Sequence, residues 1–136
     1  MRFWVVAVLV AWSTVALGQN NQSELPFSKA VRVGDMLYLS GELGVKPDTI
    51  ELVAGGIGPE TRQTMENIQA TLRSNGLGME KVVKCLVMLA DINEWAAMNE
   101  VYRTFFKAPF PARSAMGTSG LALGARVEIE CMARMD

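Results

Sequence analysis

The chain has 136 residues, with 13 lysine or arginine residues against 14 aspartate or glutamate residues, and a net charge of −1. This near-neutral balance, without any basic run, argues against a nucleic-acid-binding surface. The chain contains no histidine. Histidine-based catalytic triads, histidine-ligated metal sites and imidazole acid–base catalysis are therefore excluded.

Residues 1–18 have the pattern of a secretory signal peptide. Arg2 supplies the positive charge, residues 3–17 are apolar apart from Ser13 and Thr14, and small residues precede a polar stretch. The apolar run is shorter than the roughly 20 residues of a membrane-spanning helix, and a retained anchor is the alternative interpretation. We expect a periplasmic or secreted protein without membrane contact after cleavage, with a disordered leader over 19–25 and one folded domain over 26–136.

The first part of this domain predicts short strands. Residues 29–33 and 36–40 are β-prone, and Gly34-Asp35 between them is a hairpin signal. Residues 50–53 predict a further short strand. The segment from 55 to 58 is rich in glycine but lacks the Lys-Ser/Thr ending of a phosphate-binding loop.

The remaining elements alternate between helices and strands. Pro59 suits the first turn of a helix that Asn75-Gly76 would end. Residues 82–89 predict a central strand, and residues 126–133 predict the last one. The resulting order, β-β-(β)-α-β-α-β, predicts an α+β domain with both helices on one face of a mixed sheet. We expect the other face to be buried against copies of the chain.

The second predicted helix would be capped by Asn93. Its apolar residues form a stripe that we expect to pack against the sheet: Trp95, Met98, Tyr102 and Phe105. Asn99 lies one position round from this stripe and is a candidate site residue, the alternative being an exposed helix surface.

The two cysteines, Cys85 and Cys131, lie in different predicted strands, too far apart for a CxxC motif. They could pair in an oxidising compartment if their strands are neighbours. Cysteine is also a common small buried residue. We expect both cysteines to be buried and free.

The candidate functional residues are an arginine and a glutamate near the C-terminus. Pro111 stiffens the backbone before Arg113, whose planar guanidinium suits a carboxylate that it can bind with two hydrogen bonds. Glu128 and Glu130 alternate with apolar residues, so a strand would place both carboxylates on one face. Together the arginine and a glutamate could form an anion clamp with an adjacent base. The alternative is a surface arginine paired with a surface glutamate.

Several segments together resemble the RidA/YjgF/UK114 family. Pro111-Ala112-Arg113-Ser114, followed by Val127-Glu128-Ile129-Glu130, resembles the family signature. Further blocks match in the right order over nearly all of residues 26–136: Pro26-Phe27-Ser28-Lys29-Ala30-Val31, Leu37-Tyr38-Leu39-Ser40-Gly41, Thr64-Met65-Glu66-Asn67-Ile68 and Met98-Asn99-Glu100-Val101-Tyr102. The resemblance implies a chorismate-mutase-like fold in a homotrimer, with sheets packed centrally and clefts between subunits.

The resemblance also implies a reaction and its residues. The reaction is a cofactor-free hydrolysis of 2-aminoacrylate-type enamines, or their imine tautomers, to 2-oxo acids and ammonia. Arg113 would hold the substrate carboxylate, and Glu128 would orient or activate the attacking water. Further residues implied to bind the substrate or line the cleft are Ser40, Gly41 and Asn99, together with Phe27 and Ala115, which stand where the deaminase branch usually has tyrosine and often cysteine.

Two other functions are compatible with the resemblance. The first is a non-catalytic trimer that binds small carboxylates or amino-acid-like ligands in the same cleft. The second is the endoribonuclease or translation-inhibitor activity for which some members are named. The absence of a basic patch and of histidine argues against the second function.

Overall fold

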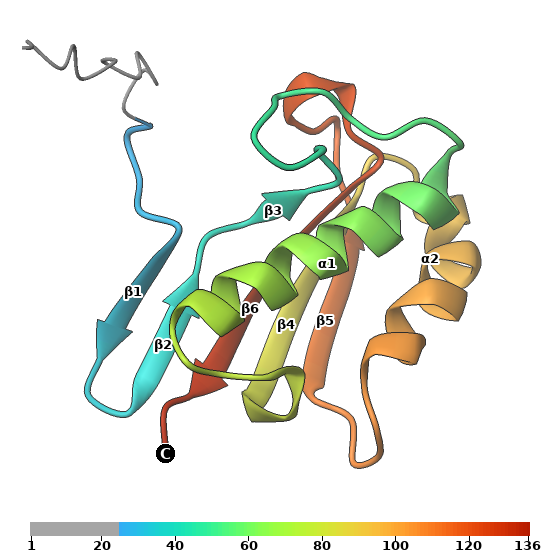
Figure 1. Cartoon of the computed structure of the whole chain (residues 1–136). Helices are drawn as coiled ribbons and strands as arrows, with labels where there is room; N and C mark the ends of the chain where they lie inside the picture. Colours follow the sequence, from blue (N-terminus) through green and yellow to red (C-terminus); the bar gives the residue numbers. More distant parts are fainter. Residues whose placement is uncertain (1–24) are drawn as a thin grey trace, which may run out of the picture.

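The computed structural model describes residues 25–136, which contain one mixed sheet and two α-helices (Figure 1). The signal peptide and nearly all of the leader predicted from the sequence lie outside these residues. Within the sheet the strand order is β1-β2-β6-β4-β5, and β3 also pairs with β6. The elements are β1 (Ala30–Val33), β2 (Met36–Leu39), β3 (Glu42–Leu43), α1 (Ile57–Ser74), β4 (Val82–Leu89), α2 (Trp95–Tyr102), β5 (Ala112–Gly117) and β6 (Val127–Arg134).

The first half of the domain confirms the hairpin and the first helix but not the strand at 50–53. Gly34-Asp35 joins β1 to β2, with Gly34 at a φ of 57°. The third strand is β3, whereas Leu52 makes only an isolated bridge to Val45. The intervening loop turns back on itself because Lys46 N donates to Glu51 O at 2.8 Å. This tight loop leaves no length of chain for a regular strand at 50–53.

The sequence did not predict strand β5, because Ala112–Gly117 is rich in small residues with weak β propensity. Its conformation comes from parallel pairing with β4, which runs in register from Lys84↔Ala112 to Leu89↔Gly117. A parallel pair needs a long crossover connection, and α2 lies within that connection. Arg113 is therefore held in a strand at the edge of the sheet.

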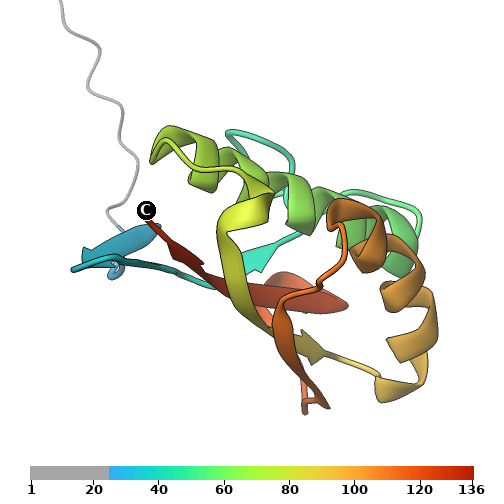
Figure 2. The ribbon, with the colours of Figure 1, turned by 90° about the horizontal axis from the view of Figure 1, so that it is seen from below.

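Both helices cover the same face of the sheet, as predicted (Figure 2). The core between them and the sheet is formed by fully buried side chains such as Met65, Ile68, Val87, Met98 and Ile129. These residues alternate with residues of the opposite face along β4 and β6. Every second side chain of β4 and β6 therefore points to the face without helices.

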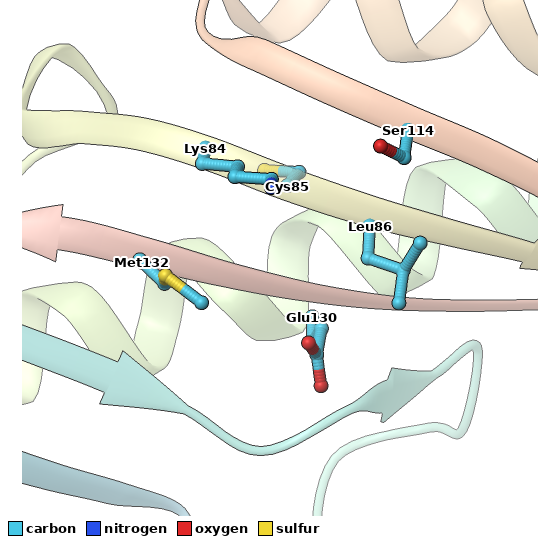
Figure 3. Close-up of a pocket in the computed structure, with 6 residues that line it drawn as sticks. All are labelled: Lys84, Cys85, Leu86, Ser114, Glu130 and Met132. Atoms are coloured by element: carbon cyan, nitrogen blue, oxygen red, sulfur yellow. The ribbon is translucent and has the colours of Figure 1, made fainter.

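The face without helices carries apolar side chains with charged ones among them. Figure 3 shows part of it, a shallow pocket lined by Lys84, Cys85, Leu86, Ser114, Glu130 and Met132. Several large apolar side chains of the β1–β2 hairpin and of β5 remain exposed, namely Val31, Val33, Tyr38 and Met116.

Helix α2 begins two residues later than its predicted cap. The side chain of Asp91, not of Asn93, accepts a hydrogen bond, and the donor is Asn93 N at 2.9 Å. A short 3₁₀ turn, Ile92–Glu94, then leads into Trp95. The carboxylate of Asp91 caps this turn better because its chain is still extended at that point.

The cysteines form a disulfide, so the expectation that they are free was wrong. Cys85 of β4 and Cys131 of β6 are direct partners in the antiparallel register. Their sulfur atoms are 2.01 Å apart, and each residue is 1% exposed. Pairing of β4 with β6 brings together two residues that are 46 positions apart in sequence. They are buried, as expected, but as a cross-link between the two central strands.

Within residues 25–136, none of the helices is both long and apolar enough to cross a membrane.

Candidate functional site

Arg113 projects from β5 to the helix-covered side of the sheet, where three side chains of α2 surround its guanidinium. Its Nη1 donates to Asn99 Oδ1 at 2.6 Å. Its Cζ lies 4.8 Å from the centroid of the Tyr102 ring and 5.8 Å from that of the Trp95 ring. A guanidinium has five N–H donors, so the amide of Asn99 leaves the Nε and Nη2 edge available to a carboxylate.

Tyr102 forms the buried support beneath this guanidinium. The residue is 5% exposed, and its ring also packs against Phe106 with centroids 5.0 Å apart. Burial raises the pKa of the Tyr102 hydroxyl, while the positive charge of Arg113 lowers it. The aromatic face attracts the cation and holds its plane without consuming an N–H donor.

Glu128 lies on β6, on the face of the sheet without helices. It alternates with Val127 and Ile129, which are fully buried in the core under α1. Partial burial raises the pKa of the Glu128 carboxyl, and the neighbouring charge of Glu130 raises it further. A carboxylate whose proton affinity is raised in this way is suited to take a proton from water and to return it.

Gly41 lies directly against Glu128. A Cβ at position 41 would be 2.1 Å from Oε1 of Glu128, so only glycine leaves the carboxylate where it is. Ser40 is fixed beside it because its Oγ donates to Ser28 O at 2.6 Å. Phe27 precedes Ser28 and is exposed. Ser40, Gly41 and Glu128 therefore lie in one region of the chain, and Phe27 directly precedes the residue that holds Ser40.

The structure thus divides the predicted site residues into two groups. Arg113 and Asn99 lie on the helix-covered side, and Ala115 faces the same way two residues further along β5. Glu128 and Gly41 lie on the opposite side. The interpretation of an arginine next to a glutamate does not hold within one chain, because strand β5 presents Arg113 to α2 while β6 presents Glu128 away from both helices.

Two residues of the arginine group were missed by sequence reasoning as site residues. Trp95 and Tyr102 were expected to pack in the core, yet Trp95 is 45% exposed beside Arg113. The signal that could have found them is spacing, because Trp95, Asn99 and Tyr102 lie at i, i+4 and i+7 on one face of α2.

Within the described part of the chain, no group of three or more cysteine, aspartate or glutamate side chains is arranged to hold a metal ion.

A family model described as endoribonuclease L-PSP matches residues 18–135. Among curated proteins, the human 2-iminobutanoate/2-iminopropanoate deaminase is 42% identical over 108 residues, 79% of each chain. The chain therefore belongs to the endoribonuclease L-PSP family, which includes the RidA and UK114 proteins.

Solved structures of this family share the fold. The Rid-family protein YyfA of Yersinia pestis superposes with a TM-score of 0.77 at 40% identity, covering 80% of this chain and 87% of its own. Escherichia coli TdcF with bound serine superposes with a TM-score of 0.78 at 32% identity, covering 84% of this chain and 91% of its own. The predicted α+β class with both helices on one side of a mixed sheet is confirmed.

Proposed function

We propose that this protein hydrolyses 2-imino acids, formed from 2-aminoacrylate-like enamines, to 2-oxo acids and ammonia. The observation that carries the proposal is the guanidinium of Arg113, fixed by Asn99 and Tyr102 with donors left over for a carboxylate. A similar protein from human, at 42% identity, is named as a deaminase of such imines. The proposed reaction needs only side chains and water.

In this reaction Arg113 binds the carboxylate of the substrate and so fixes the imine carbon. Glu128 accepts a proton from a water molecule, whose oxygen attacks that carbon while the C=N π electrons move to nitrogen. Glu128 then returns the proton to the nitrogen, which gives a neutral carbinolamine. In a second transfer Glu128 takes the hydroxyl proton and passes it to the amino nitrogen, so that the C–N bond breaks, ammonia leaves and the carbonyl forms. The raised pKa of Glu128 lets the same carboxyl serve as base and then as acid.

The two groups of site residues lead to a second proposal, that the site forms between two copies of the chain. Arg113 of one copy would meet Glu128 of its neighbour, since the two lie on opposite faces within one chain. The exposed apolar residues of the face without helices supply surface for such an assembly. We propose a homotrimer, the assembly implied by the resemblance. Sedimentation as a stable monomer at micromolar concentration would contradict it.

An alternative function is binding without turnover. The structure of TdcF with bound serine is of a similar protein holding an amino acid. A protein of this kind would need Arg113 for the carboxylate but would not need Glu128 as a base. The behaviour of Glu128→Gln therefore distinguishes the two functions.

We further propose that the protein works in the periplasm or is secreted, after removal of residues 1–18. The disulfide between Cys85 and Cys131 supports this, because such bonds persist in oxidising compartments. Cell fractionation with N-terminal sequencing tests it. An N-terminus near Gln19 in the exported fraction is expected, and a cytoplasmic protein that retains Met1 would contradict it.

The test of the proposed function is imine hydrolysis with the full chain. An amino-acid oxidase generates imines from a panel of amino acids, and their disappearance is followed with and without the protein. Arg113→Ala is expected to abolish both turnover and carboxylate binding, whereas Glu128→Gln abolishes turnover and keeps binding. Hydrolysis that survives Arg113→Ala would contradict the assigned site. Binding by the wild type without any hydrolysis would favour the alternative function.

A further inference from the structure

The guanidinium of Arg113 rests on two aromatic rings that differ in exposure. Tyr102 is 5% exposed, and its hydroxyl finds no hydrogen-bond partner. Trp95, at the start of α2, is 45% exposed although its ring centroid is 5.8 Å from the same Cζ atom. Tyr102 is therefore support from below, while Trp95 stands beside the guanidinium and faces solvent.

The position of Trp95 relates directly to a carboxylate bound at Arg113. A carboxylate that accepts two hydrogen bonds from a guanidinium has its carbon about 4 Å from Cζ. Each further carbon–carbon bond extends the ligand by about 1.5 Å. The methyl group of an alanine-derived imine is two bonds from the carboxyl carbon, whereas the branch of a leucine-derived imine extends four bonds. The longer, branched side chain therefore has more apolar surface to place against an indole ring beside the guanidinium than a methyl group has.

The residue next to Arg113 on the same side of β5 leaves room for such a side chain. Ala115 is two residues on from Arg113 and contributes only a methyl group. It is partly buried and packs against the core. The small residue at 115 takes up little room beside Arg113, and the exposed indole at 95 provides an apolar wall beside the same guanidinium.

We infer that Trp95 is a specificity-determining residue that binds the substrate's side chain, so that this protein prefers 2-imino acids with branched or aromatic side chains. The inference rests on the proposed function and narrows it to a substrate class. An exposed indole buries the most apolar surface when it contacts an apolar group of matching size, and this burial favours binding. The amide of Asn99 holds the carboxylate-binding edge at a fixed position relative to this wall.

The test compares imines derived from leucine, phenylalanine and alanine in wild type, Trp95→Ala and Trp95→Phe. We expect the wild type to have the higher kcat/KM with the leucine and phenylalanine imines. Trp95→Ala should lower these values about 10-fold and change the alanine value less than about 2-fold. Trp95→Phe should retain most of the preference. A kcat/KM ratio between leucine and alanine imines that is unchanged in Trp95→Ala would overturn the inference.

A matched control and a binding measurement separate this inference from the proposed reaction. Ile92→Ala removes an apolar side chain of similar exposure just before α2 and should leave the ratio unchanged. Calorimetry with 4-methyl-2-oxopentanoate and pyruvate measures affinity without turnover. In one outcome the wild type hydrolyses no imine but binds the branched 2-oxo acid about 10-fold more tightly than Trp95→Ala does. This result would support the role of Trp95 in binding the side chain and would contradict the deaminase proposal. Equal affinity of wild type and Trp95→Ala for 4-methyl-2-oxopentanoate would overturn the proposed role of Trp95, even where hydrolysis is seen.

Discussion

Arg113 and Glu128 lie on opposite faces of one sheet. Arg113 is on the edge strand β5 and reaches toward α2, where Asn99 accepts its hydrogen bond. Glu128 is on β6 and alternates with core residues that pack beneath α1. One chain therefore offers a carboxylate-binding group at one place and a candidate base at another. For the proposed reaction, the two groups would have to come from two copies of the chain.

The contact between Arg113 and Asn99 predicts different effects for two substitutions of Asn99. Asn99→Asp places a carboxylate within hydrogen-bonding reach of Nη1, where it competes with the substrate for the positive charge. We expect the KM for imines to rise at least about 10-fold. Asn99→Ala removes the hydrogen bond to Arg113 but leaves the positive charge of the guanidinium uncompensated, so KM should rise only about 3-fold. Steady-state kinetics with both variants measures this difference. Equal effects of aspartate and alanine would contradict the assigned orientation.

The raised pKa of Glu128 predicts that Glu128→Gln stabilises the fold at neutral pH. The carboxyl takes up its proton more readily in the folded than in the unfolded chain. Its ionised form therefore costs stability, and this cost grows as the pH rises from the unfolded value through the raised folded value. Below the unfolded value wild type and variant should melt alike. Thermal unfolding between pH 4 and pH 8 checks the trend. A variant that is less stable than the wild type at pH 8 would contradict it.

The close approach of Gly41 predicts that Gly41→Ala lowers the rate. The added methyl would be 2.1 Å from Oε1 of Glu128, so the carboxylate must move. A displacement of about 1 Å at a catalytic group can cost about 100-fold in kcat. Gly58→Ala is the control, because its methyl would meet only Val101 Cγ2, at 4.0 Å. A crystal structure of Gly41→Ala with Glu128 in its original position, or unchanged kcat, would count against this role.

The disulfide predicts a large loss of stability on removal. Cys85 and Cys131 enclose a segment with a sequence separation of 46, for which loop entropy gives about 4 kcal/mol. The double variant Cys85→Ala/Cys131→Ala should lose stability by this order in denaturant unfolding, and the wild type should lose as much in reducing agent. Intact mass without reduction should show the loss of two hydrogens. Two alkylatable thiols in the purified, unreduced protein would contradict the bond.

Much of the fold could be predicted from local patterns. Strand β4 begins and ends where its apolar run does, and Asn75-Gly76 ends α1, with Leu77 N donating to Leu72 O at 3.0 Å. These elements were predictable because propensity, burial and capping agree. Strand β5 could not be found in this way, because its small residues become a strand only through pairing with β4.

The sequence supplied candidate site residues but not the geometry that relates them. The residue types at 113 and 128 indicated a clamp and a base, but register decides which side chains share a face. Without β5 in the prediction, the side of the sheet that Arg113 faces could not be derived. The same reason explains the disulfide, since Cys85 and Cys131 meet only through the β4–β6 register. The exposure of Trp95 could not be derived either, because its place in the apolar stripe of the predicted helix indicated packing against the sheet.

The most direct test of a site shared between copies is complementation between Arg113→Ala and Glu128→Gln chains. Each variant alone should be inactive in imine hydrolysis. The two are co-expressed in equal amounts with different affinity tags, and mixed assemblies are compared with each parent. If Arg113 of one copy works with Glu128 of its neighbour, about one quarter of all sites carry both groups, and the random mixture should regain about one quarter of wild-type activity. A mixture that assembles but stays inactive would contradict the shared site.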